Sequence, residues 1–176
     1  MYPRSQLLAA AIAWGLVVVA IAACSRPAND TPRMTNSDSA FVAVQARGAD
    51  VMGVDQYTST HVFEDLPNGG RIVLQRNSVD STGTATIRIH MNNIAVRFAA
   101  GDFTLPGMVH DVEVPGTKVM AERKQLIRYV ADTLPRGGQV RIITTDATAL
   151  APVREFLVFQ RTDHRAMGHE GMKHEP

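Results

Sequence analysis

Hydrophobic and polar residues follow two periods along this chain, one typical of strands and one typical of helices. Stretches enriched in β-branched and aromatic residues favour strands, whereas apolar residues spaced three or four apart favour one face of a helix. The predicted strands are residues 58–64, 71–75, 125–132 and 139–144. The predicted helices are residues 40–47, ending at Gly48, then 84–100 and 146–160. The order after the first helix is therefore strand, strand, helix, used twice.

The two longer helices each carry an apolar face. In the first, the apolar residues are Ile87, Met91, Ile94 and Phe98, and Gly101 follows as a stop signal. In the second, they are Leu150, Val153, Phe156 and Leu157. Pro152 lacks the backbone donor for residue 148, which predicts a helix that begins near Ala151 or has a loose first turn from Asp146.

The two strand pairs share one turn chemistry. Residues 66–74 and 134–142 both read LPxGG followed by alternating aliphatic residues. Asparagine and glycine tolerate positive φ, so both segments predict a hairpin turn. The alternative is chance recurrence of a common turn. We interpret the repeat as two ββα units, which predicts an α+β fold with a four-stranded antiparallel sheet and two helices packed on one face.

The start of the chain has the pattern of a bacterial lipoprotein signal peptide. Residues 7–23 are continuously apolar, Arg4 precedes them, and the only cysteine, Cys24, follows two alanines. The pattern predicts a signal over residues 1–23, a lipid on Cys24 and attachment to the envelope membrane. Ser25 favours the outer membrane, with the domain facing the periplasm. An uncleaved transmembrane anchor is the alternative, because the apolar run has nearly the length of a bilayer span.

Composition limits what the remaining chain can do. Residues 24–39 are polar and predict a flexible linker, and residues 40–163 predict one α+β domain. The net charge of +1 offers no one-signed field for a nucleic acid. With Cys24 lipidated, the domain has no disulfide and no thiolate. Any metal site must therefore use His, Met, Asp or Glu.

Residues 164–176 have an unusual composition and are predicted to be a disordered tail. Imidazole and thioether side chains recur there at short intervals, namely His164, Met167, His169, Met172 and His174. Imidazole suits copper and zinc, and thioether sulfur favours soft Cu(I), so the tail predicts copper chelation outside the cytoplasm. The alternative is an ordinary frayed terminus, which Gly168, Gly171 and Pro176 are typical of.

Three further histidines fall within the predicted domain. His61 shares strand parity with Phe63, which predicts that both point toward the helices. His90 lies on the flank of the apolar helix face, so it can approach His61. Together with His110, these residues form a candidate metal site in the domain. The alternative is that each is a core histidine hydrogen-bonded to backbone.

Catalytic motifs are absent, which favours a non-enzymatic protein. The chain has no GxSxG, GxxxxGK[ST], HExxH or CxxC segment. An enzyme would need a pocket that holds His61, His90 and a carboxylate such as Asp102 or Asp111. A third alternative is an interaction module that docks another envelope protein through the sheet face or an edge strand. A broad apolar patch on that face would favour docking.

Several segments resemble a family of small exported bacterial proteins that are often labelled aspartate carbamoyltransferase. The matching segments are RGADVMGVD (47–55), THVF (60–63), IRIHMNNIAVRFAAGDF (87–103), HDVEVPG (110–116) and FLVFQRTDH (156–164). The resemblance implies a shared fold and a shared site lined by His61, His90, His110 and His164, between the first hairpin and the helices. Val62 departs from it, because the family usually has a second histidine there.

The transferase activity in that label does not fit the chain. A transcarbamoylase needs two domains that clamp carbamoyl phosphate and aspartate, and a Ser-Thr-Arg-Thr phosphate loop. This chain has 176 residues and lacks such a loop. An exported domain would also not meet carbamoyl phosphate. We therefore expect the resemblance to transfer a fold rather than an activity.

Overall fold

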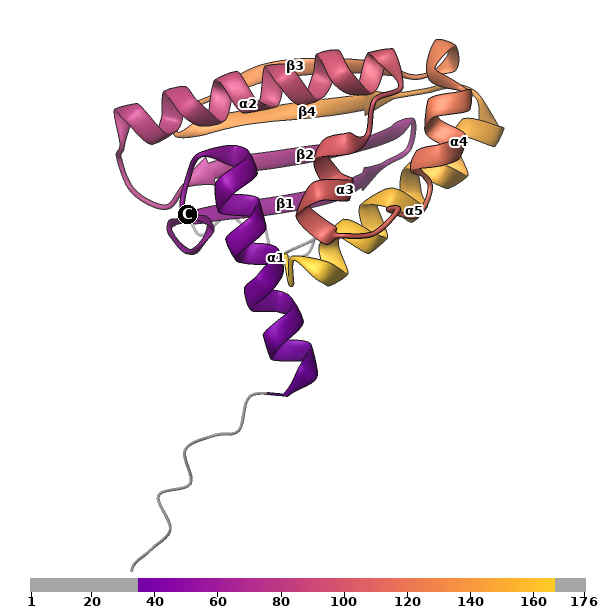
Figure 1. Cartoon of the computed structure of the whole chain (residues 1–176). Coiled ribbons are helices and arrows are strands. Elements are labelled where there is room, and N and C mark those ends of the chain that lie inside the picture. The colour runs from indigo at the N-terminus through magenta and orange to yellow at the C-terminus, as the bar shows by residue number, and fades with distance from the viewer. Residues whose placement is uncertain (1–34, 167–176) are drawn as a thin grey trace, which may run out of the picture. The chain divides into compact units, whose positions relative to one another are not determined.

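Two hairpins meet side by side at the centre of one antiparallel sheet in the computed structural model, which describes residues 35–166. The strands are β1 (Ser59–Leu66), β2 (Gly69–Arg76), β3 (Arg128–Leu134) and β4 (Gly137–Ile143). Their spatial order is β1-β2-β4-β3, and helices lie against the sheet (Figure 1). The predicted α+β class with a four-stranded antiparallel sheet is confirmed.

The glycines of the repeated turn explain why the two hairpins fit together. A Cβ atom on Gly69 would lie 1.9 Å from the carbonyl oxygen of Ile142 in the other hairpin. A Cβ atom on Gly137 would lie 2.0 Å from the carbonyl oxygen of Leu74. Each turn therefore presses against the backbone of the opposite central strand, and only glycine leaves room for that approach.

Backbone hydrogen bonds repeat the same relationship. The N–H of Arg76 donates to the carbonyl of Arg136 at 2.9 Å, and the N–H of Thr144 donates to the carbonyl of Asn68 at 2.9 Å. Each bond joins the end of a central strand to the turn of the other hairpin. The two halves of the domain are thus related by an approximate twofold arrangement.

The two long helices are exchanged between the halves. α2 (Ser81–Ala100) packs on β3 and β4, and α5 (Ala147–Asp163) packs on β1 and β2 (Figure 1). Aspartates cap both N-termini, Asp80 for α2 and Asp146 for α5. Each helix therefore covers the hairpin that the other half of the sequence supplies.

The predicted helix faces are buried, except that Leu150 of α5 is only partly buried. Ile87, Met91, Ile94 and Phe98 of α2 are all buried, and Gly101 ends the helix at a φ of 81°. α5 begins at Ala147, which agrees with the alternative of a first turn from Asp146 rather than with a start near Ala151, and it continues through Pro152. The side chain of Asp146 makes this possible, because it accepts hydrogen bonds from two backbone N–H groups of the first turn.

The first helix differs from its prediction at both ends. α1 spans Asn36–Met52, so it begins inside the predicted linker over residues 24–39 and passes Gly48. Thr35 and Asp38 form a capping box that starts the helix, and Gly53, at a φ of 70°, ends it. The sequence prediction missed this cap and placed the helix over residues 40–47.

Two short helices were not predicted. They are α3 (Thr104–His110) and α4 (Thr117–Glu122), and they are accompanied by the 3₁₀ turns η1 (Gln56–Thr58) and η2 (Lys124–Leu126). Because η2 occupies the start of the predicted strand 125–132, β3 begins only at Arg128. Of these short elements, α3 and η1 carry residues of the site described below.

The core lies between the sheet and the helices and is formed by large apolar side chains from both. Its fully buried members include Leu74, Ile87, Met91, Phe98, Met120, Val140, Ile142, Val153, Phe156 and Leu157. Within residues 35–166, none of the helices combines the length and apolar character needed to cross a bilayer. The predicted signal peptide and Cys24 lie outside the described residues.

Candidate functional site

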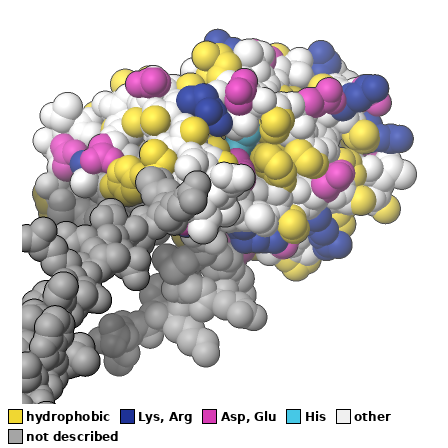
Figure 2. Space-filling view, turned by 60° about the horizontal axis from the view of Figure 1, so that its bottom comes forward, with side chains coloured by type: hydrophobic (Ala, Val, Ile, Leu, Met, Phe, Trp, Pro, Cys, Tyr) yellow, Lys and Arg dark blue, Asp and Glu magenta, His cyan; other side chains and the backbone are white. Residues whose placement is uncertain are grey.

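A small cavity lies beside the core and is lined by every histidine of the described part of the chain. It has a volume of about 60 Å³. Its polar lining residues are His61, His90, His110, His164, Gln56 and Gln160. Its apolar lining includes Met52, Phe63, Met91, Ile94, Phe98, Leu105, Val109 and Phe156. On the face seen in Figure 2, only a small area of histidine surface shows among hydrophobic, basic and acidic side chains.

Each histidine comes from a different element. His61 lies on β1, His90 on α2, His110 at the end of α3, and His164 caps the C-terminus of α5. The strand parity of His61 and Phe63 is as expected, since both rings face the cavity and stack with centroids 5.8 Å apart. The fold therefore gathers four imidazoles that lie far apart in the sequence.

His164 is the centre of this group of rings. Its ring centroid lies 5.0 Å from that of His61 and 5.5 Å from that of Phe63, in stacked arrangements. The ring of His110 meets it edge-on at 4.9 Å. His164 is therefore part of the folded domain, which corrects the prediction that the tail begins at this residue.

His110 differs from the other three because the protein occupies both of its ring nitrogens. Nδ1 bonds to the carboxylate of Asp163, and Nε2 bonds to the Oε1 atom of Gln160 at 3.0 Å. Both partners lie at the end of α5, so these bonds fix α3 against α5. No ring nitrogen of His110 is left to bind a ligand, and its contribution to the site is positional.

Burial keeps the other three histidines uncharged at neutral pH. Loss of hydration lowers the pKa of His90 to about 4. Burial, followed by repulsion from His90, lowers the pKa of His61 to about 4. Burial, followed by repulsion from His61 and His110, lowers the pKa of His164 to about 3 against the opposing effect of Asp163. Each ring therefore offers a neutral nitrogen lone pair.

Several buried polar atoms of the lining have no hydrogen-bond partner among the described residues. They are Nδ1 of His164, both amide atoms of Gln56 and Nε2 of Gln160. Most buried polar groups in proteins are paired with protein or with water, so such atoms call for a partner. Donors and acceptors are both present, which suits a ligand that can offer both.

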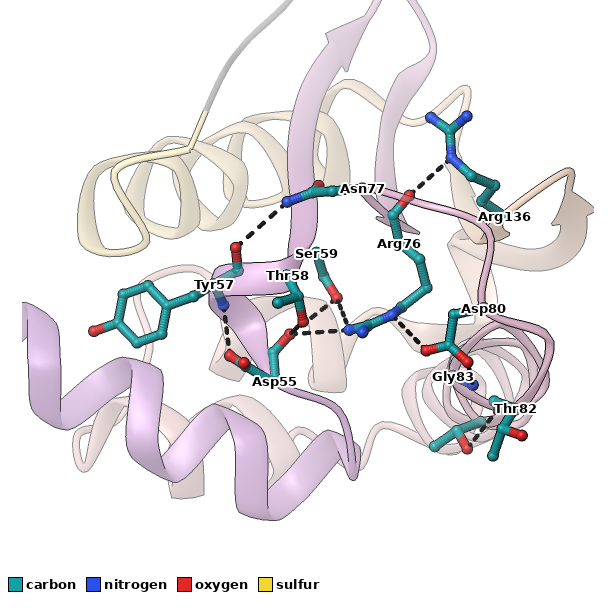
Figure 3. Close-up of polar contacts among 11 residues, drawn as sticks. Asp55, Tyr57, Thr58, Ser59, Arg76, Asn77, Asp80, Thr82, Gly83 and Arg136 are labelled. Carbon is teal, nitrogen blue, oxygen red and sulfur yellow. Dashed lines mark hydrogen bonds and ion pairs between the residues drawn. The ribbon is translucent and has the colours of Figure 1, made fainter.

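A polar junction holds Gln56 in the cavity wall. Arg76 donates from Nη1 to the carbonyl of Asp55 at 3.2 Å and to Oγ of Ser59 at 2.9 Å, on either side of η1 (Figure 3). Arg76 also pairs with Asp80 at the start of α2. Gly48 leaves the space for the amide, because a Cβ there would lie 1.4 Å from Nε2 of Gln56. The segment from Gly48 to Gln56 therefore shapes the site.

A second, larger pocket adjoins the cavity. It has a volume of about 210 Å³ and shares Gln56, His61 and His164 with the cavity lining. Its other lining residues are Phe41, Gln45, Tyr57, Ser59, Thr60, Arg165 and Ala166. We call it the outer pocket.

The carboxylates proposed for an enzyme lie elsewhere. Asp102 pairs with Arg97 and accepts from the N–H of Thr104, and Asp111 ends α3 in a left-handed conformation. Neither lines the cavity. The carboxylate nearest the imidazoles is Asp163, which sequence reasoning missed although it directly precedes His164.

The structure describes the candidate metal ligands of the domain, but not those of the tail beyond His164. His61, His90 and His110 lie together as the resemblance implied. Within the described residues, however, no group of three or more His, Cys, Asp or Glu side chains could hold a metal ion. Met167, His169, Met172 and His174 lie outside those residues.

Taken together, the fold and the site define an α+β domain with an apolar, histidine-lined cavity. Comparison with protein-family models, with curated proteins and with solved structures found no match for this chain.

Proposed function

We propose that this domain is a non-enzymatic binding domain that holds a small molecule in the histidine-lined cavity. The observation that carries the proposal is the convergence of all four described histidines on one apolar cavity. Neutral imidazoles and unpaired amide atoms supply directed hydrogen bonds, and the apolar wall supplies contact area. This combination is typical of ligand sites in proteins.

We also propose that a lipid on Cys24 holds the domain at the envelope membrane, on the periplasmic side of the outer membrane. The support is the apolar segment 7–23 followed by the only cysteine of the chain. We expect the Cys24→Ala protein to leave the membrane fraction when cells are fractionated, whereas the wild type stays with it. A variant that still fractionates with the envelope lipids would contradict lipid attachment.

Copper binding is a second candidate function, favoured by the pairing of His61 with His164. Metal–imidazole bonds are about 2 Å long, so rings with centroids 5.0 Å apart can reach one ion after small rotations. Met52 and Met91 in the same lining provide thioether sulfur, which soft Cu(I) prefers. Such a site would use two imidazoles and thioethers rather than three imidazoles. The tail residues from Met167 to His174 would add further ligands.

Docking of an envelope protein on the sheet has less support than small-molecule binding or copper binding. The sheet face away from the helices carries ion pairs, between Arg71 and Glu64 and between Arg141 and Asp132. Among the described residues, no large exposed hydrophobic side chain lies on a strand. The broad apolar patch that would favour an envelope partner on this face is therefore not found in residues 35–166.

Filling the cavity tests the binding function. Val109, on α3, is buried in the cavity wall. Val112 lies two residues beyond the end of α3, is 51% exposed and serves as the control position. We expect full-length protein to bind 2-(4-fluorophenyl)ethanol or 4-fluorophenylacetate in ligand-observed fluorine NMR. Val109→Phe should abolish this binding, and Val112→Phe should leave it unchanged. Leu105→Phe, in the same wall, is the second filling variant. Binding that none of the filling variants weakens would refute the cavity as the site.

Calorimetry of the same proteins with Cu(I) and Zn(II) tests copper. A copper site in the cavity predicts heat with Cu(I) that His164→Gln abolishes and that a chain ending at Ala166 retains. A site in the tail predicts the reverse. The truncation is placed after Ala166 because His164 belongs to the cavity. If neither Cu(I) nor Zn(II) produced heat, the copper function would be excluded.

A further inference from the structure

The two adjoining pockets define the shape of a ligand that can occupy both. Gln56, His61 and His164 line the cavity on one side and the outer pocket on the other. The cavity, of about 60 Å³, has room for roughly four water molecules. That is comparable to one six-membered ring. A ligand with a small apolar body in the cavity and a polar group in the outer pocket would therefore contact Gln56, His61 and His164, which form the wall between them.

The cavity walls favour a planar ring as the apolar body. His61, His164 and Phe63 present stacked rings with centroids 5.0–5.8 Å apart. Phe98 and Phe156 also line the cavity and meet edge-on at 5.9 Å. Aromatic groups pack best in such offset and edge-on arrangements. An aromatic body thus gains contacts that an aliphatic chain of the same volume lacks.

The charge of the two pockets favours an anionic polar group. Their linings, drawn from the described residues, contain no aspartate, glutamate or lysine. The one charged lining residue within those residues is Arg165, in the outer pocket. Asp38, which is not part of either lining, pairs with Nη2 of this guanidinium at 2.8 Å, so a ligand carboxylate would bond to its other nitrogens, and neither lining offers a carboxylate to a cationic ligand.

The side chain of Arg165 is held in place at the outer pocket. Its backbone has a φ of 48°, the left-handed conformation that closes the C-terminus of α5, where the N–H of Ala166 donates to the carbonyl of Arg161 at 2.9 Å. One guanidinium nitrogen, Nη2, contacts Ser37 and Asp38, and the group lies 4.5 Å from the ring of Phe41. These contacts fix the side chain at the outer pocket, and its hydrogen bonds to Ser37 and Asp38 use only Nη2. Among the described residues, the N–H groups on Nε and Nη1 have no hydrogen-bond partner, so they remain available to the carboxylate of a ligand.

We propose that the ligand is a small aromatic carboxylate, with its ring in the cavity and its carboxylate in the outer pocket, bonded to the guanidinium of Arg165. This inference rests on the proposed binding function and specifies its ligand class. His61 and His164 hold the connection between ring and carboxylate. A neutral alcohol of the same shape fills the cavity but lacks the ion pair.

The test compares 4-fluorophenylacetate with 2-(4-fluorophenyl)ethanol on full-length protein by fluorine NMR. We expect the carboxylate to bind at least tenfold more tightly, and Arg165→Gln to remove that preference while alcohol binding persists. Arg154→Gln, at an exposed position of α5, is the matched charge control. Asp38→Asn breaks the ion pair with Arg165 but keeps the guanidinium, so the preference should survive it.

The outcomes separate the two proposals. The carboxylate inference would be overturned if both probes bound equally tightly or if the alcohol bound more tightly. The cavity function would still stand in that case, provided that Val109→Phe abolished the binding. Failure of both probes to bind would overturn the cavity function with it. A preference that Arg165→Gln retains would also overturn the inference, provided that thermal melting shows this variant folded.

Discussion

Lowering the pH from 8 to 5 is expected to reduce the free energy of unfolding by about 4 kcal/mol. The cause is the neutral state that burial imposes on His90 and His164, whose pKa values fall to about 4 and about 3. In the unfolded chain each regains a pKa near 6.5. The unfolded state therefore binds more protons at pH 5, and each of the two residues favours unfolding by roughly 2 kcal/mol.

The sign follows from the lowered pKa in the folded state. The stabilising contribution is complete above pH 6.5 and is lost as the pH falls from 6.5 toward 4. The pKa of His61 is also lowered to about 4, but its side chain is only partly buried, so it is left out of the total of about 4 kcal/mol and adds to it in the same direction. The carboxylates whose pKa values are lowered by hydrogen bonds do not act in this window. Asp38, Asp102 and Asp146 have pKa values below 3.8 in the folded state and lose their contribution only at lower pH.

Chemical denaturation at pH 8, 7, 6 and 5 measures this dependence. The matched variant is His90→Gln, which removes one buried imidazole and should reduce the loss between pH 8 and 5 by roughly 2 kcal/mol. A wild-type protein whose free energy of unfolding stays constant from pH 8 to 5 would show that the histidines are not held neutral.

The second large effect is expected at the repeated turn. We expect Gly137→Ala to reduce the free energy of unfolding by roughly 3 kcal/mol and the melting temperature by about 10 °C. The added Cβ would lie 2.0 Å from the carbonyl oxygen of Leu74, so β2 and β4 must move apart at the centre of the sheet. No flexible side chain can absorb that overlap.

Gly107→Ala is the control for this substitution. A Cβ at Gly107, inside α3, would meet only ordinary contacts, the nearest at 3.7 Å from the carbonyl of Val112. Alanine favours the helix by up to about 1 kcal/mol over glycine, so this variant should melt at the same temperature or higher. Equal melting temperatures for the two variants would contradict the role given to the glycine pair.

Sequence reasoning predicted the sheet and its two long helices because each has a strong local signal. The LPxGG repeat marked both turns, and the spacing of Ile87, Met91, Ile94 and Phe98 marked the buried face of α2. The short helices α3 and α4 were missed because 7 and 6 residues are too few for a periodic apolar face. The exchange of α2 and α5 between hairpins was also out of reach, since pairing of distant elements has no local pattern.

The site was predicted in part. His61, His90, His110 and His164 were grouped through the resemblance, and the structure shows them lining one cavity. Spacing alone would not have joined them, because they come from four elements. Gln56 and Gln160 were missed because an amide has no motif of its own. His164 was assigned to the tail, because its composition resembles the residues after it, whereas its cap position depends on where α5 ends.

The exchange of helices means that neither ββα half holds a complete interior. α2 without β3 and β4 exposes its apolar face, and α5 without β1 and β2 does the same. A nick between α2 and β3 would therefore leave two mutually dependent fragments with matching surfaces. Two identical copies of a single ββα half could bury each other's apolar helix faces in the same manner. The present chain thus has the architecture that fusion of a symmetric pair of short polypeptides would produce, with an imidazole at residue 61 of one half and a tyrosine at the equivalent residue 129 of the other.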